Sequence, residues 1–404
     1  MIPSFAWRNL WRNKLRSFII ILAVTLGIFA GIFLTAFTNG MVNSRIQSII
    51  STEMSHIQIH QPVFLDNDQF SLVISDADSV VRLAKETPGV VAASKRIIIN
   101  SMVASAETGT GVKITGIDPE YEMKVTDLSS KIISGRYLDS TDRNSVVISE
   151  KLALKLKVSL KNKIIITVQD VNKNITGGAF RIAGIFRTDN SMFDEANIFV
   201  RGTDLSRLTG LKGHEAHEIA ILLNKNETDA VTKTLSGMFP NLEVRSWQQL
   251  SPEAGYLVSA MNQYMFIFII VILIALCFGI INTMLMVIME RIHELGMLMA
   301  IGMNRARVFA MIMLETVFLS LTGGITGLIL GYAAIKYFAK AGINLYFWKE
   351  AFSELGYSAY IYPVIDSKTM GITAILVMIA GIFSALYPAY KALKLNPSDA
   401  IRTQ

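Results

Sequence analysis

The sequence has few charged residues. They make up 17% of its 404 residues, whereas about 25% is usual in a soluble chain. The single cysteine, Cys277, excludes a disulfide scaffold, and the nine prolines are too few for a collagen-like repeat. Because 51% of the residues are hydrophobic, the lack of charge indicates segments buried in lipid and not a disordered chain.

The motifs of common catalytic sites are also missing. The sequence contains no G-x-x-x-x-G-K-[ST] loop for nucleotide phosphates, no H-E-x-x-H, no G-x-S-x-G and no C-x-x-C. Two close histidine pairs, His56 with His60 and His214 with His217, could in principle bind a metal ion. Because no cysteine accompanies them, the favoured interpretation is that these histidines are polar surface residues. We therefore predict no metal site, no cofactor bound by this chain and no catalytic activity.

Four apolar runs are long enough to cross a membrane, which takes about 20 residues. They cover residues 17–37, 264–289, 308–335 and 369–390. The first run is longer than the apolar core of a signal peptide and has no A-x-A-like cleavage site close behind it, so we interpret it as a retained anchor. The sequence thus predicts four transmembrane helices.

The distribution of charge predicts the orientation. Basic residues outnumber acidic ones in the N-terminal segment, in the loop 290–307 and in the C-terminal tail. The positive-inside rule puts these segments, and with them both termini, in the cytoplasm. The net charge of +6 comes mostly from these flanks, which argues against nucleic-acid binding. We expect a multi-pass protein of the inner (cytoplasmic) membrane.

The segment between the first two spans, residues 40–262, is long enough for its own hydrophobic core. Strand, helix and strand patterns follow one another near its start and again near its end, which indicates a split βαβ lobe. Between them, residues 105–212 form a β-rich insertion. The predicted fold class is therefore an α-helical membrane protein with four transmembrane helices plus an α+β extracytoplasmic domain between helices 1 and 2.

The loop 290–307 has the pattern of an amphipathic helix. Its apolar residues recur at helical spacing, with Arg291 and Glu294 beside them, and Gly296 and Gly302 permit close approach or a sharp turn. Such a helix could dock into a groove of a partner protein, or it could simply extend the bundle. The pattern alone leaves both interpretations open.

Several motifs together point to a family. Three motifs follow one another along the chain: the N-terminal W-R-N-L-W-R-N-K-L-R, the stretch R-I-H-E-L-G-M-L-M-A-I-G-M-N-R (291–305) and the C-terminal Y-P-A-Y-K-A-L-K-L-N-P-S-D-A-I-R. The chain resembles FtsX-like, MacB-type ABC transporter permeases over essentially its whole length. The resemblance implies three parts: residues 1–39 with an amphipathic N-terminal helix and helix 1, the extracytoplasmic domain 40–262, and residues 263–404 with helices 2–4.

The resemblance also implies how such a chain works. Two permease subunits, in a homo- or heterodimer, would each contact a separate ABC ATPase subunit, which binds ATP and Mg, through the loop 290–307. Closure of the ATPases would then be transmitted mechanically to the outer domains. The implied coupling residues are Arg291, Glu294, Leu295, Gly296, Leu298, Met299, Ala300, Gly302 and Met303, with Leu295, Leu298 and Met299 filling a groove of the ATPase.

Within the family, the chain is most similar to lipoprotein-releasing (Lol-type) permeases. These extract acylated lipoproteins from the inner membrane and pass them to a periplasmic carrier. The resemblance implies an acyl-chain path between spans one and two of opposing subunits, with Met261, Tyr264, Met265 and Phe268 as its upper lining. It also implies a carrier-binding hairpin with the tip Val171, Asn172, Lys173 and Asn174. Efflux of drugs, peptides or other amphiphiles, and mechanical activation of a periplasmic enzyme, are the alternatives.

Three further features of the apolar segments allow more than one interpretation. The small-xxx-small patterns Gly27/Gly31 and Gly323/Gly327/Gly331 suit helix packing within one chain or between two subunits. The intramembrane carboxylate Glu315 suggests a structural or coupling role in preference to a proton relay. An aromatic cluster at residues 346–362 is typical of a membrane interface and also fits a guide for lipid chains.

Overall fold

The computed structural model describes residues 14–67, 70–224, 228–365 and 367–393. The chain forms two compact units. We call the first the membrane unit (residues 14–42, 258–344 and 360–393 of the described chain) and the second the inserted domain (residues 43–257 and 345–359). The predicted amphipathic N-terminal helix and the end of the C-terminal motif lie outside the described residues.

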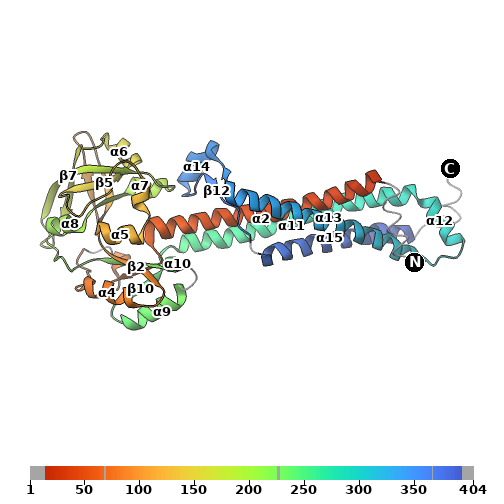
Figure 1. The fold of residues 1–404 in the computed structure, drawn as a ribbon, viewed down its shortest axis with the longest axis horizontal. Coiled ribbons are helices and arrows are strands. Elements are labelled where there is room, and N and C mark those ends of the chain that lie inside the picture. Colours follow the sequence, from red (N-terminus) through yellow and green to blue (C-terminus); the bar gives the residue numbers. More distant parts are fainter. Residues whose placement is uncertain (1–13, 68–69, 225–227, 366, 394–404) are drawn as a thin grey trace. The chain divides into compact units, whose positions relative to one another are not determined.

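Four long helices run alongside one another in the membrane unit (Figure 1). Each is long and apolar enough to cross a membrane, which confirms the predicted spans. They are α2 (Lys14–Ser48), α11 (Pro252–Glu290), α13 (Arg305–Ala341) and α15 (Ser367–Leu393). A short helix, α12 (Ile292–Ala300), joins α11 to α13.

The glycines of α13 pack against α2 of the same chain. A methyl group at Gly323 would lie 2.8 Å from the Ile21 carbonyl oxygen, and one at Gly327 would lie 2.9 Å from the Thr25 carbonyl oxygen. The Thr25 hydroxyl donates a hydrogen bond to the Gly323 carbonyl oxygen at 3.1 Å. Small residues let helix backbones approach this closely, and dispersion and hydrogen bonding then hold them together in lipid. These glycines of α13 therefore serve helix packing within one chain.

The inserted domain is built on one ten-stranded sheet. The strand order is β10-β1-β9-β2-β3-β8-β5-β7-β4, with β6 pairing both β2 and β7. The strands are β1 (Ile57–His60), β2 (Val90–Ala104), β3 (Gly109–Ile117), β4 (Ile132–Gly135), β5 (Ser145–Ser149), β6 (Lys163–Gln169), β7 (Ile175–Phe186), β8 (Asn197–Arg201), β9 (Glu218–Leu223) and β10 (Glu243–Ser246).

Short helices precede, connect and follow these strands. They are η1 (Ile49–Met54), α3 (Phe64–Asn67), α4 (Ala77–Glu86), α5 (Pro119–Val125), η2 (Leu128–Lys131), α6 (Glu150–Leu156), α7 (Ser191–Ala196), α8 (Gly202–Thr209), α9 (Thr228–Met238) and α10 (Trp247–Leu250). Asp76 caps α4 by accepting from the Ser79 amide, and Asn190 caps α7 in the same way. Such caps satisfy amides that lack a partner inside the helix.

The two ends of the inserted domain pair with each other, as the split βαβ pattern predicts. β1 lies between β10 and β9, antiparallel to both, and β9 pairs with β2. Ile57 and Ile59 of β1 pack with Ile219 and Ile221 of β9 in one buried cluster that includes residues of α4 and α9. Segments about 160 residues apart in the sequence thus share one core, which confirms this part of the fold class.

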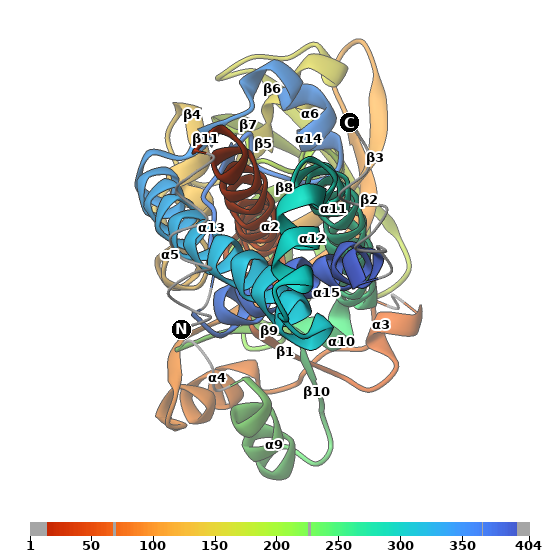
Figure 2. The same ribbon diagram turned by 90° about the vertical axis from the view of Figure 1, so that its right-hand side faces the viewer.

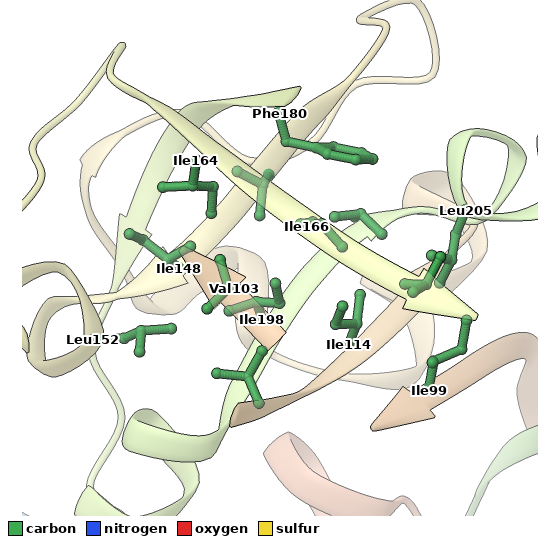
Figure 3. Packing of buried hydrophobic residues seen from close by; sticks show 14 of the residues in the cluster. Ile99, Val103, Ile114, Ile148, Leu152, Ile164, Ile166, Phe180, Ile198 and Leu205 are labelled. Carbon is green, nitrogen blue, oxygen red and sulfur yellow. The ribbon is translucent and has the colours of Figure 1, made fainter. Parts of the chain in front are cut away.

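The β-rich insertion closes into a barrel. β2, β3, β8, β5, β7 and β6 pair in turn, and β6 returns to β2 through Met102, Val103 and Ala104. Alternate side chains point inward and fill the interior, among them Val103, Ile148 and Phe180 (Figure 3). Because β2 runs through both parts, the split lobe and the barrel belong to one sheet and are not separate lobes.

The second connection outside the bundle has its own structure. After α13, β11 (Ile343–Asn344) pairs with β12 (Tyr360–Ile361). Between them lie η3 (Tyr346–Trp348) and α14 (Lys349–Glu354). Residues 345–359 pack with the inserted domain, where the Ser353 and Ser191 hydroxyls lie 3.2 Å apart.

Candidate functional site

The predicted coupling segment forms a tight helical turn at one end of the bundle. Figure 2 shows α12 from this end, between α11 and α13. The Gly302 backbone has φ +103°, a left-handed conformation that favours glycine. The Met303 amide donates to the Leu298 carbonyl at 3.0 Å and the Gly302 amide to the Met299 carbonyl at 3.1 Å. This Schellman motif ends α12, so Gly302 shapes the turn.

The side chains of α12 face two ways. Leu295 is buried in the core of the bundle, and Leu298, Met299 and Met303 pack against that core. This differs from the sequence prediction, in which Leu295, Leu298 and Met299 fill a groove of a partner. Helical periodicity identifies an apolar face but does not say what covers it. Gly296 is also buried.

The exposed face of α12 carries other residues. Glu294, Ala300 and Gly302 are exposed, as predicted residues of a contact surface would be. The two apolar residues beside them, Met297 and Ile301, were missed by the sequence analysis, and Ile301 is 81% exposed. No signal in the sequence marks them, because residues 297–301 are all apolar and the packing of α12 decides which of them are exposed.

Arg291 turns inward. Its Nη1 lies 3.4 Å from Oε1 of Glu315 on α13, and the two side chains are only 11% and 8% exposed. The pair lines a cavity of about 360 Å³ together with apolar residues of α11, α12 and α13. Glu294, Met297 and Ile301 of the exposed face also border this cavity. A charged pair withdrawn from water is costly to break, because one charge would remain buried. Arg291 therefore links the end of α11 to α13.

The four residues of the predicted acyl-chain path share α11 but not one environment. Met265 is buried, Tyr264 and Phe268 are exposed, and Met261 is half-buried. α11 is also the least covered of the four long helices, with 17% of its most apolar window buried inside the chain. Its apolar surface is thus available to lipid or to another subunit.

The predicted hairpin tip is compact and tied back to the domain. The Asp170 carboxylate accepts hydrogen bonds from the amides of Asn172 and Asn174 at 2.9 and 2.7 Å, and Lys173 has φ +65°. The Val171 amide donates to the Thr209 carbonyl at the end of α8 at 3.0 Å. The structure therefore brings Val171, Asn172, Lys173 and Asn174 together in one short polar turn.

The predicted surface location is wrong for two of the histidines, because His60 and His217 are fully buried. His60 Nε2 donates to Glu218 at 3.2 Å, while His217 Nε2 donates to the Phe70 carbonyl and its Nδ1 accepts from the Ile98 amide. Burial lowers the pKa of His217. Among the described residues, no group of three or more histidine, cysteine or acidic side chains could hold a metal ion.

Glu218 belongs to a buried ionic cluster at the centre of the sheet. Arg96 on β2 lies 2.7 Å from Glu218 on β9 and 2.6 Å from Glu122 on α5. Burial alone would raise the pKa of Glu218, but the hydrogen bond from His60 and the charge of Arg96 lower it to about 2. Each charge thus has a partner, as buried charges require.

Family models match both units of the chain. The MacB-like periplasmic core domain matches residues 17–237, and the FtsX-like permease C-terminal region matches residues 265–397. The lipoprotein-releasing system transmembrane protein LolC of Neisseria meningitidis serogroup B is 22% identical over 344 residues, which are 81% of this chain and 82% of the relative.

Two further proteins show more local similarity. The macrolide export ATP-binding/permease protein MacB of Chlorobium luteolum is 32% identical over 124 residues, 31% of this chain and 16% of that protein. The crystal structure of the periplasmic region of MacB from Actinobacillus actinomycetemcomitans covers 53% of this chain and 94% of its own, with 12% identity and a TM-score of 0.36. The two family models and the four long apolar helices show that this multi-pass membrane protein belongs to the LolC/MacB/FtsX type of ABC transporter permeases.

Proposed function

We propose that this chain is a non-enzymatic permease subunit that couples ATP hydrolysis in a separate ATPase subunit to the release of lipoproteins from the inner membrane. In this proposal both termini are cytoplasmic, the chain binds no cofactor, and ATP and Mg bind to the ATPase. The observation that carries it is the similarity to a LolC protein along four fifths of both chains. A second permease subunit, identical or related, completes the transporter.

The exposed face of α12 is the proposed contact with the ATPase. Glu294 supplies a charge, and Met297 and Ile301 supply apolar area next to Ala300 and Gly302. Behind this surface, Leu295 and Gly296 are buried, Leu298, Met299 and Met303 pack against the core of the bundle, and Arg291 pairs with Glu315 of α13. A push on α12 is then passed to two spans at once.

The cargo path and the carrier contact complete the proposal. Acyl chains would move along the uncovered surface of α11 near Met261, Tyr264, Met265 and Phe268, next to membrane lipids. A periplasmic carrier would bind at the tip Val171, Asn172, Lys173 and Asn174. The low burial of α11 supports the first part, and the exposed polar tip is compatible with the second.

A reconstituted release assay tests this function. The complex of this chain with its ATPase is placed in liposomes with a triacylated lipoprotein, and the transfer of lipoprotein to the soluble fraction is measured with and without ATP. The variant Ile301→Asp should lose both ATPase binding and release. Leu154→Asp, at an exposed position of α6, is the matched control and should retain both. ATP-independent or absent release by the wild type would overturn the lipoprotein assignment.

Efflux of a macrolide or another amphiphile is the second candidate. The identity of 32% to a macrolide export protein over 124 residues favours it. The same liposomes, loaded with a macrolide in place of the lipoprotein, separate the two functions: efflux predicts ATP-dependent transport of the drug and no lipoprotein release. The contact of α12 with the ATPase is common to both.

A further inference from the structure

The loop between α13 and α15 exposes an apolar patch. Phe347 is 90% exposed, and Tyr346, Trp348 and Leu355 are also largely exposed. We call these four residues the aromatic foot. Phe347 and Trp348 contact each other edge to face, with ring centroids 5.5 Å apart. Exposed apolar side chains that gather on a protein surface often mark an interaction site.

The loop does not need these side chains for its own packing. Its interior is formed by Phe352 and Tyr357, whose ring centroids lie 6.4 Å apart, with Tyr357 buried. Gly356, at φ +74°, ends α14, and the Tyr357 amide donates to the Phe352 carbonyl at 2.8 Å. The fold of the loop therefore leaves the aromatic foot outside.

Chain connectivity keeps the aromatic foot within reach of the end of α13. α13 ends at Ala341, and the five residues from there to Tyr346 span at most about 18 Å. The β11–β12 pair and the hydrogen bond from the Leu345 amide to the Ala359 carbonyl, at 2.8 Å, close the loop at its base. Both ends of the loop thus return to membrane-spanning helices.

We propose that the aromatic foot inserts into the lipid headgroup layer at the C-terminal end of α13, with no protein partner covering it. Tyrosine and tryptophan are enriched at this depth because one part of each ring system is apolar and another is polar. Lys340, in the last turn of α13, supplies positive charge for lipid phosphates. Lys349, whose Nζ lies 5.2 Å from the Tyr346 ring centroid, is followed in α14 by Glu350 and Glu354.

The opposite side of the loop connects this lipid contact to the inserted domain. Ser353 of α14 meets Ser191 of α7, and the Arg45 guanidinium lies under Gly356. Arg45 also pairs with Glu53 at 2.6 Å, and Glu53 accepts a hydrogen bond from Asn190 at 2.9 Å. Under this proposal, residues 345–359 would attach the inserted domain to the bilayer in addition to the helices that enter it.

Spin-label accessibility measures the depth directly. Because Cys277 is the single cysteine of the sequence, the Cys277→Ser protein is a clean background for labels at Phe347→Cys and Leu355→Cys. Leu154→Cys, exposed on α6 of the inserted domain, is the matched control. The full-length protein is placed in phosphatidylcholine–phosphatidylglycerol liposomes, and collision with oxygen, which enters lipid, is compared with collision with a water-soluble nickel chelate.

In liposomes, the proposal predicts that the ratio of oxygen to nickel accessibility is several-fold higher at Phe347→Cys and Leu355→Cys than at Leu154→Cys. After transfer of the protein to a detergent-free amphipol, this difference should disappear. A ratio equal to that of the control would overturn it, because the patch would then face water. Low accessibility to both reagents would also overturn it, because a protein would then cover the patch. Neither readout depends on the substrate or on the ATPase.

Discussion

The inserted domain and the membrane unit are stabilised by different means. In the inserted domain, ten strands are joined by backbone hydrogen bonds and a cluster of four titratable side chains around Arg96 lies at the centre of the sheet. In the membrane unit, α13 approaches α2 through glycines, and the ionic contact between Arg291 and Glu315 lies near one end.

The difference reflects the two solvents. Water drives apolar side chains together, so isoleucine, valine and phenylalanine fill the barrel of the inserted domain. This stabilisation offsets the cost of burying a few charges, each of which is paired. Lipid provides no such force between apolar helices, so close backbone approach must supply the attraction. Four substitutions or conditions test this contrast, in order of decreasing effect.

Removing the central cation of the inserted domain should have the largest effect. Arg96→Met leaves Glu122 and Glu218 buried together without a counter-charge and should cost about 3–5 kcal/mol of unfolding free energy. Hydrogen exchange of β2 and β9 peptides in the full-length protein measures it. Lys151→Met, which breaks an exposed pair with Glu195, should cost less than about 1 kcal/mol. Equal losses in the two variants would contradict the contrast.

Breaking the ion pair of the membrane unit comes next. Glu315→Leu leaves Arg291 at the end of α11 with a buried charge and should cost about 3 kcal/mol. The double variant Arg291→Met/Glu315→Leu should recover most of this stability, since neither charge of the pair is then left buried without its partner. Unfolding in mixed detergent micelles gives both values. A double variant that is less stable than Glu315→Leu would show that the pair is not the relevant interaction.

The glycine contacts should give a smaller, position-specific effect. Gly327→Ala places a methyl group 2.9 Å from α2 and should destabilise the bundle by about 1–3 kcal/mol. Gly279→Ala on α11 meets no heavy atom within 4 Å, so the better helix propensity of alanine should leave stability unchanged or raise it by up to about 1 kcal/mol. The same micelle titration compares them, and identical behaviour would rule out the α13–α2 contact.

Acid should destabilise the inserted domain at a higher pH than the membrane unit. At pH 4 we expect this loss of stability to be the smallest of the four effects. The folded pKa of Glu218, about 2, is below its ordinary value of 4.5, so its contribution to stability is complete above pH 4.5 and falls as the pH drops toward 2. Hydrogen exchange of the β9 peptide, corrected for the intrinsic pH dependence, should accelerate below pH 4.5. Glu218→Gln should remove that extra dependence.

The sequence by itself determined the four spans, the place of the inserted domain and the existence of α12, because hydropathy and helical periodicity are local properties. The barrel closure was beyond such patterns, because β6 pairs with β2 some 60 residues away. Only the tertiary structure decided that Arg291 meets Glu315, that His60 and His217 are buried, and that Met297 and Ile301 form the outer face of α12. Each of these depends on which neighbour covers a side chain, and that neighbour is distant in sequence.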